Sequence, residues 1–195
     1  MSGRPAVFVD RDGVVNALVP DPVSGAPESP LTAGDVRLLD GAADALRLLR
    51  DAGYALVGAS NQPAAAKGKT TRESLEAVQA RVIELLAERG AEFDDFRICW
   101  HHESAADPAL RGPCPCRKPA PGMLLDAAAH LGLELARSWM VGDTDADVLA
   151  GTAAGVRTVL IEHPPSAFKR TAGAEPTARA ADLGAAARLI AGRDR

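Results

Sequence analysis

Two aspartates separated by one residue end a short apolar run near the start of the sequence. Asp10 and Asp12 follow residues 6–9, which are small, β-branched or aromatic and predict a buried parallel strand. Alternate residues of an extended chain point the same way, so both carboxylates can face one point where open α/β sheets bind ligands. Two anions so close favour a hard cation such as Mg²⁺. Taken alone, the pair could also be an Asp-rich loop that caps a helix.

Two more polar pairs lie at the ends of predicted elements. Ser60 and Asn61 follow the strand predicted over 54–59, and their hydroxyl and amide could donate to an oxyanion. A single serine there is more often a helix cap. Arg117 and Lys118 follow a proline-rich loop at the start of a predicted helix, where phosphate recognition requires cations. Adjacent cations are otherwise typical of solvated surface.

A fourth cluster is acidic. Asp143 follows the strand predicted over 139–141, and Asp145 and Asp147 come two and four residues later. Acidic residues often stabilise the start of a helix through its dipole, and we expect this role for Asp145. Asp143 stands at the strand end and is free to bind a cation.

All three cysteines of the chain lie close together in the sequence, beside two histidines. Cys99, His101, Cys114 and Cys116 have the C-x-H and C-x-C spacings of a four-coordinate structural zinc site. A Cys-x-Cys pair makes a poor disulfide, which favours metal over three ordinary thiols. His102 is the alternative imidazole ligand. We expect Zn²⁺ to hold the loop 99–118 so that the cations that follow point into the site.

The remaining pattern predicts the elements that carry these groups. Residues 17–34 contain four prolines and predict a surface loop that lies over the paired aspartates. Strands alternate with helices along the rest of the chain, which predicts a parallel sheet covered by helices on both faces. Further strands are expected over 93–100 and 156–161, and helices over 41–53, 71–89, 122–131, 145–154 and 180–191.

Length and composition limit the class of protein. The 195 residues are sufficient for one domain over 1–195, and we assign no chemistry to the tail over 163–195. The net charge is -4 without a Lys/Arg run, so we expect neither nucleic acid nor a membrane as partner. No apolar stretch is long enough to span a bilayer and no signal-peptide core is evident, which favours a cytoplasmic location. We expect a monomer.

Taken in order, the four polar clusters resemble the four motifs of the haloacid dehalogenase (HAD) superfamily of phosphotransferases. They read Asp-x-Asp-Gly from Asp10, Ser-Asn from Ser60, Arg-Lys-Pro from Arg117 and Gly-Asp-x-x-x-Asp from Gly142, and the likeness spans residues 7–155. The resemblance implies a Rossmann-like parallel sheet, and no long insertion for a large cap domain is present. It also implies phosphate-ester chemistry on a small phosphorylated substrate.

The same resemblance implies roles for the site residues. Asp10 would be the nucleophile that forms an aspartyl-phosphate, and Asp12 would protonate the leaving oxygen and later take a proton from water. Ser60 and Lys118 would hold the phosphoryl group, and Asn61 and Arg117 would contact the substrate. Catalytic Mg²⁺ would be bound by the Asp10 carboxylate, the Asp12 backbone carbonyl and Asp143, with Asp147 in support.

The cysteine-rich loop before Arg117 narrows the resemblance to one branch of the superfamily. That branch contains D-glycero-D-manno-heptose 1,7-bisphosphate 7-phosphatase and the histidinol-phosphate phosphatase domain, and the run from Cys114 through Met123 is more similar to the heptose enzyme. Arg117 would then hold the second phosphate or orient the sugar. Pro63, Thr144 and the long loop over 17–30 differ from the family pattern at the substrate end. A module without turnover, and phosphate transfer to an acceptor other than water, are the alternatives.

Overall fold

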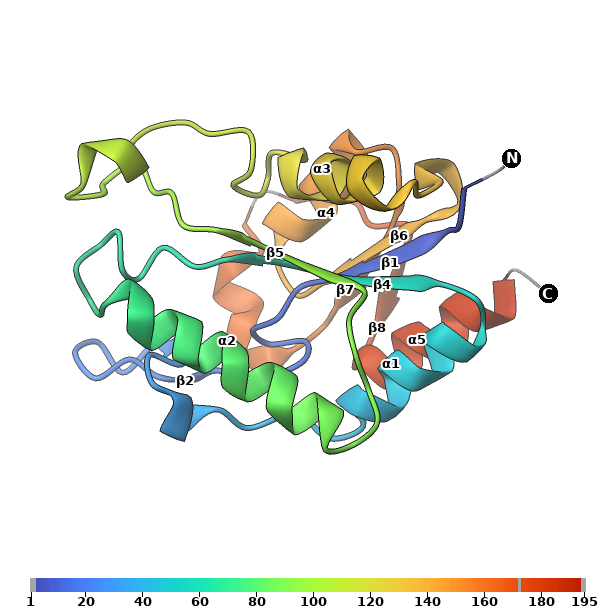
Figure 1. Cartoon of the computed structure of the whole chain (residues 1–195), viewed down its shortest axis with the longest axis horizontal. Helices are drawn as coiled ribbons and strands as arrows, with labels where there is room; N and C mark the ends of the chain where they lie inside the picture. Colours follow the sequence, from blue (N-terminus) through green and yellow to red (C-terminus); the bar gives the residue numbers. More distant parts are fainter. Residues whose placement is uncertain (1–2, 172, 194–195) are drawn as a thin grey trace.

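The computed structural model describes residues 3–171 and 173–193, and these residues are arranged around one parallel sheet (Figure 1). The strand order is β5-β4-β1-β6-β7-β8 and every neighbouring pair is parallel. The strands are β1 (Ala6–Val9), β4 (Ala55–Asn61), β5 (Asp95–Cys99), β6 (Trp139–Gly142), β7 (Arg157–Ile161) and β8 (Ala178–Ala180). The predicted α/β class and HAD-like fold are confirmed.

Five helices cover the two faces of the sheet. They are α1 (Ala42–Asp51), α2 (Arg72–Ala87), α3 (Gly122–Leu131), α4 (Asp145–Ala153) and α5 (Leu183–Arg193). Figure 1 shows α3 and α4 above the sheet and α1, α2 and α5 below it. β1 supplies both cores because its side chains alternate: Val7 and Val9 pack toward α1, α2 and α5, and Ala6 and Phe8 toward α3.

Helix α2 shows how local sequence fixes an element. The Thr71 side chain accepts a hydrogen bond from the Ser74 backbone N–H and caps the helix. Apolar residues at helical spacing face the core, and Leu75, Val78 and Val82 are fully buried. The helix predicted over 71–89 is therefore present with its predicted start.

The tail is more structured than its sequence indicates. The sequence predicts only a helix over 180–191, whereas the structure adds β8 as an edge strand that pairs with β7, and α5 packs on α1. A short 3₁₀ helix, η4 (Pro164–Lys169), precedes them. β8 has the sequence Ala-Arg-Ala, which carries little strand propensity, so pairing with β7 rather than local preference makes it a strand.

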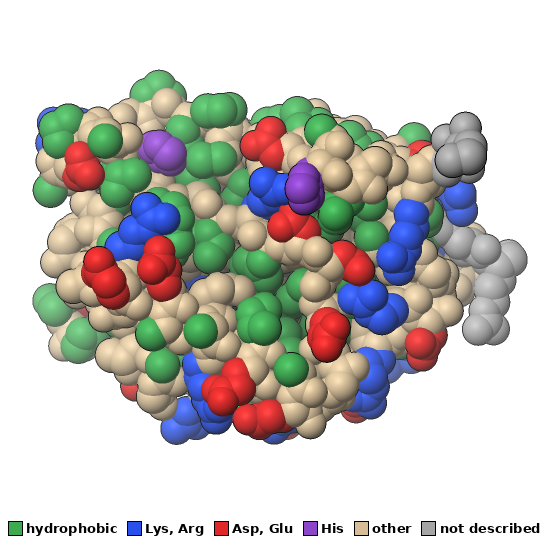
Figure 2. Space-filling view, in the orientation of Figure 1, with side chains coloured by type: hydrophobic (Ala, Val, Ile, Leu, Met, Phe, Trp, Pro, Cys, Tyr) green, Lys and Arg blue, Asp and Glu red, His purple; other side chains and the backbone are tan. Residues whose placement is uncertain are grey.

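The remaining segments form the surroundings of the site. Residues 17–34 contain a small hairpin of β2 (Val19–Pro20) and β3 (Pro27–Glu28), and no separate cap domain is inserted within the described residues. No helix in the described part of the chain is long and apolar enough to cross a membrane. Acidic and basic side chains are interspersed on the face drawn in Figure 2, without a patch of one sign.

Candidate active site

The carboxyl ends of three strands bring the predicted acidic residues to one edge of the sheet. Val9 of β1 pairs with Gly58 of β4 and with Val141 of β6, so the residues that follow these strands are neighbours. Asp10 and Asp143 line one cavity of about 290 Å³. Its walls are formed by Asp10, Asp12, Glu28, Ser29, Asn61, Pro63, Lys67, Arg117, Lys118, Asp143, Thr144, Ala146, Asp147 and Lys169.

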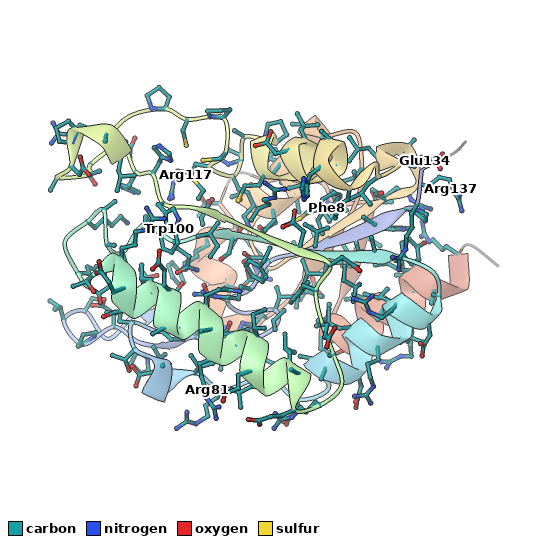
Figure 3. The ribbon with its side chains drawn as sticks, viewed as in Figure 1. Phe8, Arg81, Trp100, Arg117, Glu134 and Arg137 are labelled. Atoms are coloured by element: carbon teal, nitrogen blue, oxygen red, sulfur yellow. The ribbon has the colours of Figure 1, made fainter. Side chains whose placement is uncertain are left out.

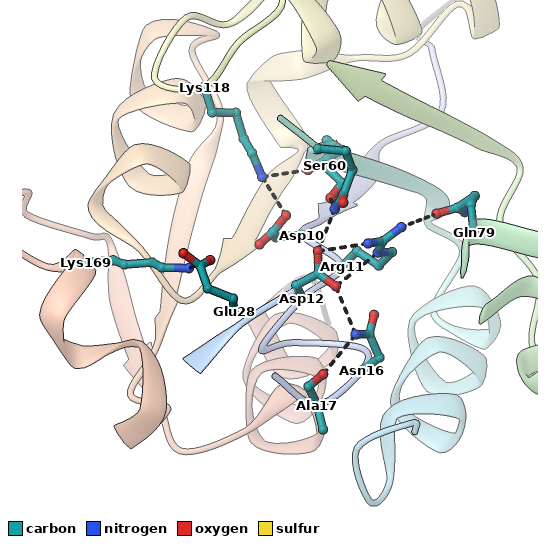
Figure 4. A network of polar contacts seen from close by, with 12 residues as sticks. Asp10, Arg11, Asp12, Asn16, Ala17, Glu28, Ser60, Gln79, Lys118 and Lys169 are labelled. Carbon is teal, nitrogen blue, oxygen red and sulfur yellow. Dashed lines mark hydrogen bonds and ion pairs between the residues drawn. The ribbon is translucent and has the colours of Figure 1, made fainter. Parts of the chain in front are cut away.

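Lys118 joins two of the carboxylates at the floor of this cavity. Its Nζ lies 2.7 Å from Asp10 Oδ1 and 2.6 Å from Asp147 Oδ1, and it donates to the Ala59 carbonyl oxygen at 2.6 Å (Figure 4). Lys118 is only 4% exposed, so this ion-pair network is shielded from water. The two carboxylates keep the ammonium charged by raising the pKa of Lys118, although burial opposes this.

The lysine is positioned by its own backbone and by Asn61. The Asn61 Nδ2 donates to the Lys118 carbonyl at 3.0 Å, and the Lys118 N–H donates to Asn61 Oδ1 at 3.1 Å. Asn61 ends β4, so this pair ties the segment before α3 to the sheet. The predicted substrate contact of Asn61 stays a prediction, and the structure adds a positioning role.

Asp10, Asp143 and Asp147 place carboxylate oxygens within 4.8 Å of one another, an arrangement that could hold a metal ion. Asp143 Oδ1 is buried and has no hydrogen-bond partner among the described residues. Three buried carboxylates face a single ammonium group, so an oxygen-binding divalent cation fits the excess negative charge. Asp147 Oδ2 accepts hydrogen bonds from the Thr144 N–H and hydroxyl, which suits the supporting role expected for it.

Gly13 allows the chain to turn beside this cluster. Its φ is +84°, which favours glycine, and an added Cβ would lie 2.1 Å from Asp143 Oδ2. A side chain at this position would therefore displace a candidate metal ligand.

Burial changes the protonation of the carboxylates in the absence of metal. Burial raises the pKa of Asp10 from 3.8 to about 8, helped by Asp147, Asp143 and Asp12, while Lys118 opposes the rise. Burial and the Asp147 charge raise the pKa of Asp143 to about 6. A cation in the cluster must displace these protons, so metal and protons compete for the same oxygens.

This competition predicts how stability depends on pH. Protonation of Asp10 and Asp143 stabilises the metal-free fold fully below pH 3.8, and this contribution is lost as the pH rises through about 6 and about 8. We therefore expect the metal-free Tm to fall between pH 5.5 and 8.5, while the rise in Tm caused by Mg²⁺ grows over the same window. Thermal unfolding in EDTA and in Mg²⁺ measures both. An effect of Mg²⁺ that does not change with pH, or that persists in Asp143→Asn, would contradict this assignment.

Asp12 has a different environment from Asp10. The fully buried Arg11 contacts it through Nε at 3.2 Å and Nη2 at 3.1 Å, and the amides of Asn16 and Gln62 donate to it at 2.9 and 2.6 Å. Burial raises the pKa of Asp12, but the Arg11 charge and these hydrogen bonds outweigh burial and hold it below 3.8. Arg11 also donates to Gln79 of α2 at 3.1 Å. The sequence analysis missed Arg11, because nothing local shows that this guanidinium turns inward.

Ser60 lies behind the cavity wall. It is 1% exposed, and its Oγ accepts a hydrogen bond from Gln62 Nε2 at 2.8 Å. Ser60 is not one of the residues that line the cavity in the empty site. Its predicted contact with the phosphoryl group stays a prediction that requires a small local movement.

The cysteine-rich loop forms a second metal-type cluster. The ligand atoms of Cys99, His101, Cys114 and Cys116 all lie within 4.8 Å of one another. Cys116 Sγ lies 3.3 Å from Cys114 Sγ and 3.5 Å from His101 Nδ1, and all three cysteines are free. His102 turns away, because its Nδ1 contacts Ser104 Oγ at 2.7 Å. Of the two predicted alternatives, His101 is the one that the structure places in the cluster.

Three thiols so close fit a soft cation that takes deprotonated sulfur. Without metal, burial raises the pKa of Cys116, and the neighbouring Cys99 and Cys114 raise it further. Three thiolates and one imidazole are a ligand set of structural zinc, with every position filled by protein. Arg117 and Lys118 follow the cluster directly, and Figure 3 shows Arg117 beside the end of β5 from which the loop leaves.

The cavity also contains residues that sequence reasoning did not select. Glu28 and Ser29 come from the hairpin over 17–34, which confirms that this loop lies against the site. Lys67 follows β4, and Lys169 belongs to η4 of the tail. The expectation that the tail carries no site residue is therefore wrong. The pairing of the tail with β7 folds it back across the sheet, and no local pattern around Lys169 indicates that return.

Comparison with known proteins agrees with this geometry. A family model described as HAD-hydrolase-like matches residues 115–186. The D-glycero-beta-D-manno-heptose-1,7-bisphosphate 7-phosphatase of Rhodopseudomonas palustris is 38% identical over 153 residues, which cover 78% of this chain and 81% of that protein. The chain belongs to the HAD-like hydrolase family.

Other members of the HAD-like family carry the same likeness. The D-glycero-beta-D-manno-heptose-1,7-bisphosphate 7-phosphatase of Escherichia coli K12 is 37% identical over 157 residues, covering 80% of this chain and 78% of that protein. The structure of D,D-heptose 1,7-bisphosphate phosphatase from B. bronchiseptica, in complex with magnesium and phosphate, superimposes with a TM-score of 0.76. It is 28% identical and covers 95% of this chain and 97% of that one.

Proposed function

We propose that this protein is a Mg²⁺-dependent phosphomonoesterase that works through an aspartyl-phosphate and removes the 7-phosphate of D-glycero-D-manno-heptose 1,7-bisphosphate. The buried Asp10–Lys118–Asp147 network, with Asp143 beside it, is the observation that carries the proposal. The names of the relatives in R. palustris, E. coli and B. bronchiseptica support the choice of sugar.

The residues of this chain divide the reaction between them. Asp10 attacks phosphorus, and the bond from phosphorus to the sugar oxygen breaks as the aspartyl-phosphate forms. Lys118 lies on the Asp10 carboxylate and can donate to a phosphoryl oxygen that arrives there. Water then attacks the aspartyl-phosphate and releases inorganic phosphate and Asp10. Mg²⁺ bound by Asp10 and Asp143, with the Asp12 carbonyl, supplies positive charge between nucleophile and substrate.

Asp12 moves the protons in both halves of the reaction. In the empty site Arg11 holds Asp12 as an anion, which suits acceptance of a proton from the attacking water. An incoming phosphate adds negative charge beside Asp12 and increases its affinity for a proton. The protonated carboxyl can then donate to the departing sugar oxygen.

Zn²⁺ is the second metal of the proposal. Cys99, His101, Cys114 and Cys116 would hold it, and the site has no position left for water. Its role would be structural, fixing the loop whose next residues are Arg117 and Lys118. A cytoplasmic location and a monomeric state stay predictions from the sequence.

A phosphate-release screen tests the proposed reaction and its substrate together. We expect kcat/KM for the heptose 1,7-bisphosphate to exceed that for histidinol phosphate and other sugar phosphates by about tenfold or more, since a site built for a second anionic group loses that interaction with the others. ³¹P NMR should show that the 1-phosphate remains on the product. A preference for histidinol phosphate would replace the substrate, and product formation without free phosphate would indicate transfer to another acceptor.

A further inference from the structure

An ion pair joins the hairpin to the tail across the mouth of the active-site cavity. Lys169 Nζ lies 3.4 Å from Glu28 Oε2, and both residues line the same cavity as Asp10. Figure 4 shows the pair beside Asp10 and Lys118. The side chains are 32% and 40% exposed, so an incoming ligand can reach them. Ion pairs of this exposure contribute little to stability, so the contact can be exchanged for another at low cost.

The wall around this pair is cationic. Lys67, Arg117 and Lys169 line the cavity in addition to Lys118, which is already engaged by Asp10 and Asp147. Glu28 is the one acidic residue of the lining outside the group of four aspartates at the floor. Three cations therefore share a single carboxylate.

Mutual repulsion among the three cations is evident from Lys67. Within the described residues its ammonium has no ion pair. Burial lowers the pKa of Lys67, and Arg117 and Lys169 are among the charges that lower it further, while Glu28 opposes them. A second anion at the cavity mouth would relieve this repulsion, and Glu28 would repel that anion.

We propose that Lys169 is a specificity residue that exchanges Glu28 for the second, non-reacting anionic group of a bisphosphorylated substrate. The inference rests on the proposed phosphatase function and refines it. Glu28 competes with the substrate for Lys169, so the two residues of one ion pair have opposite effects on substrate affinity. A pair that only fastened the hairpin to the tail would give effects of the same sign.

Kinetics at saturating Mg²⁺ with heptose 1,7-bisphosphate and heptose 7-phosphate test this exchange. We expect Lys169→Gln to raise KM for the bisphosphate by about five- to tenfold, as for loss of one charge-assisted contact, and by much less for the monophosphate. Lys169→Arg should restore most of the preference. Glu28→Gln should lower KM for the bisphosphate, because Lys169 is then free for the anion.

Lys69→Gln is the matched control. Lys69 also forms an ion pair with the hairpin segment, at 2.7 Å from Asp21 Oδ2, but it does not line the active-site cavity. We expect it to leave the ratio of the two KM values unchanged. Equal effects of Lys169→Gln on both substrates, a main effect on kcat, or a raised bisphosphate KM in Glu28→Gln would overturn the inference.

Binding measurements separate failure of this inference from failure of the proposed function. If the wild-type protein hydrolyses neither sugar, the phosphatase assignment fails. Calorimetric titration of the bisphosphate into Asp10→Asn, with and without Lys169→Gln, still measures the contact. A Kd that is unchanged by Lys169→Gln, or no binding to the Asp10→Asn protein, would then reject Lys169 as an anion-binding residue.

Discussion

Asp10→Asn abolishes phosphate release, with an expected loss in kcat on the order of 10⁴-fold or more, as for removal of other covalent nucleophiles. An amide oxygen is a poor nucleophile toward phosphorus and a weaker metal ligand than a carboxylate. The fold should persist, because Lys118 keeps its contacts with Asp147 and the Ala59 carbonyl. Release of inorganic phosphate from heptose 1,7-bisphosphate in Mg²⁺ measures the loss, and thermal unfolding checks the fold.

Asp126→Asn is the control for this prediction. Asp126 is an exposed aspartate of α3 that does not line the cavity, so its replacement removes the same charge without touching the site. We expect activity within about twofold of wild type, since surface substitutions away from special features have small effects. An Asp10→Asn protein that keeps full activity would show that another group attacks phosphorus.

Cys114→Ser removes the bound zinc and loosens the loop over 99–118. Metal analysis of the wild-type protein should find about one zinc per chain, since the four-ligand cluster is complete, and close to none in the variant. We expect Tm to fall by about 5–10 °C, because loss of a structural metal costs several kcal/mol in a chain of this size. kcat/KM should fall as well, since the loop positions Arg117 and Lys118.

His102→Ala separates the zinc ligand from its neighbour. His102 contacts Ser104 and lies outside the cluster, whereas His101 belongs to it. His102→Ala should retain zinc and Tm, and His101→Ala should lose zinc as Cys114→Ser does. Zinc content that follows His102 instead would show that the loop rearranges when metal binds.

The sequence alone determined the elements and the positions at their ends. Helix α2 was predictable because its apolar residues recur with the helical period and Thr71 caps its start. Asp10 and Asp143 were predictable as neighbours because each follows an apolar strand, and parallel strands end at one edge of a sheet. Cys99, Cys114 and Cys116 were predictable as a cluster because ligand spacing along the chain constrains a metal site.

Only the tertiary structure decided which distant side chains meet. Glu28 and Lys169 are 141 residues apart in the sequence, and they meet because the edge strand β8 returns the tail to the sheet. Arg11 turns inward to Asp12 and Gln79 although its neighbours in sequence give no sign of it. Local patterns record the period and direction of one segment, whereas a charge pair or an edge strand depends on packing between segments that are remote in sequence.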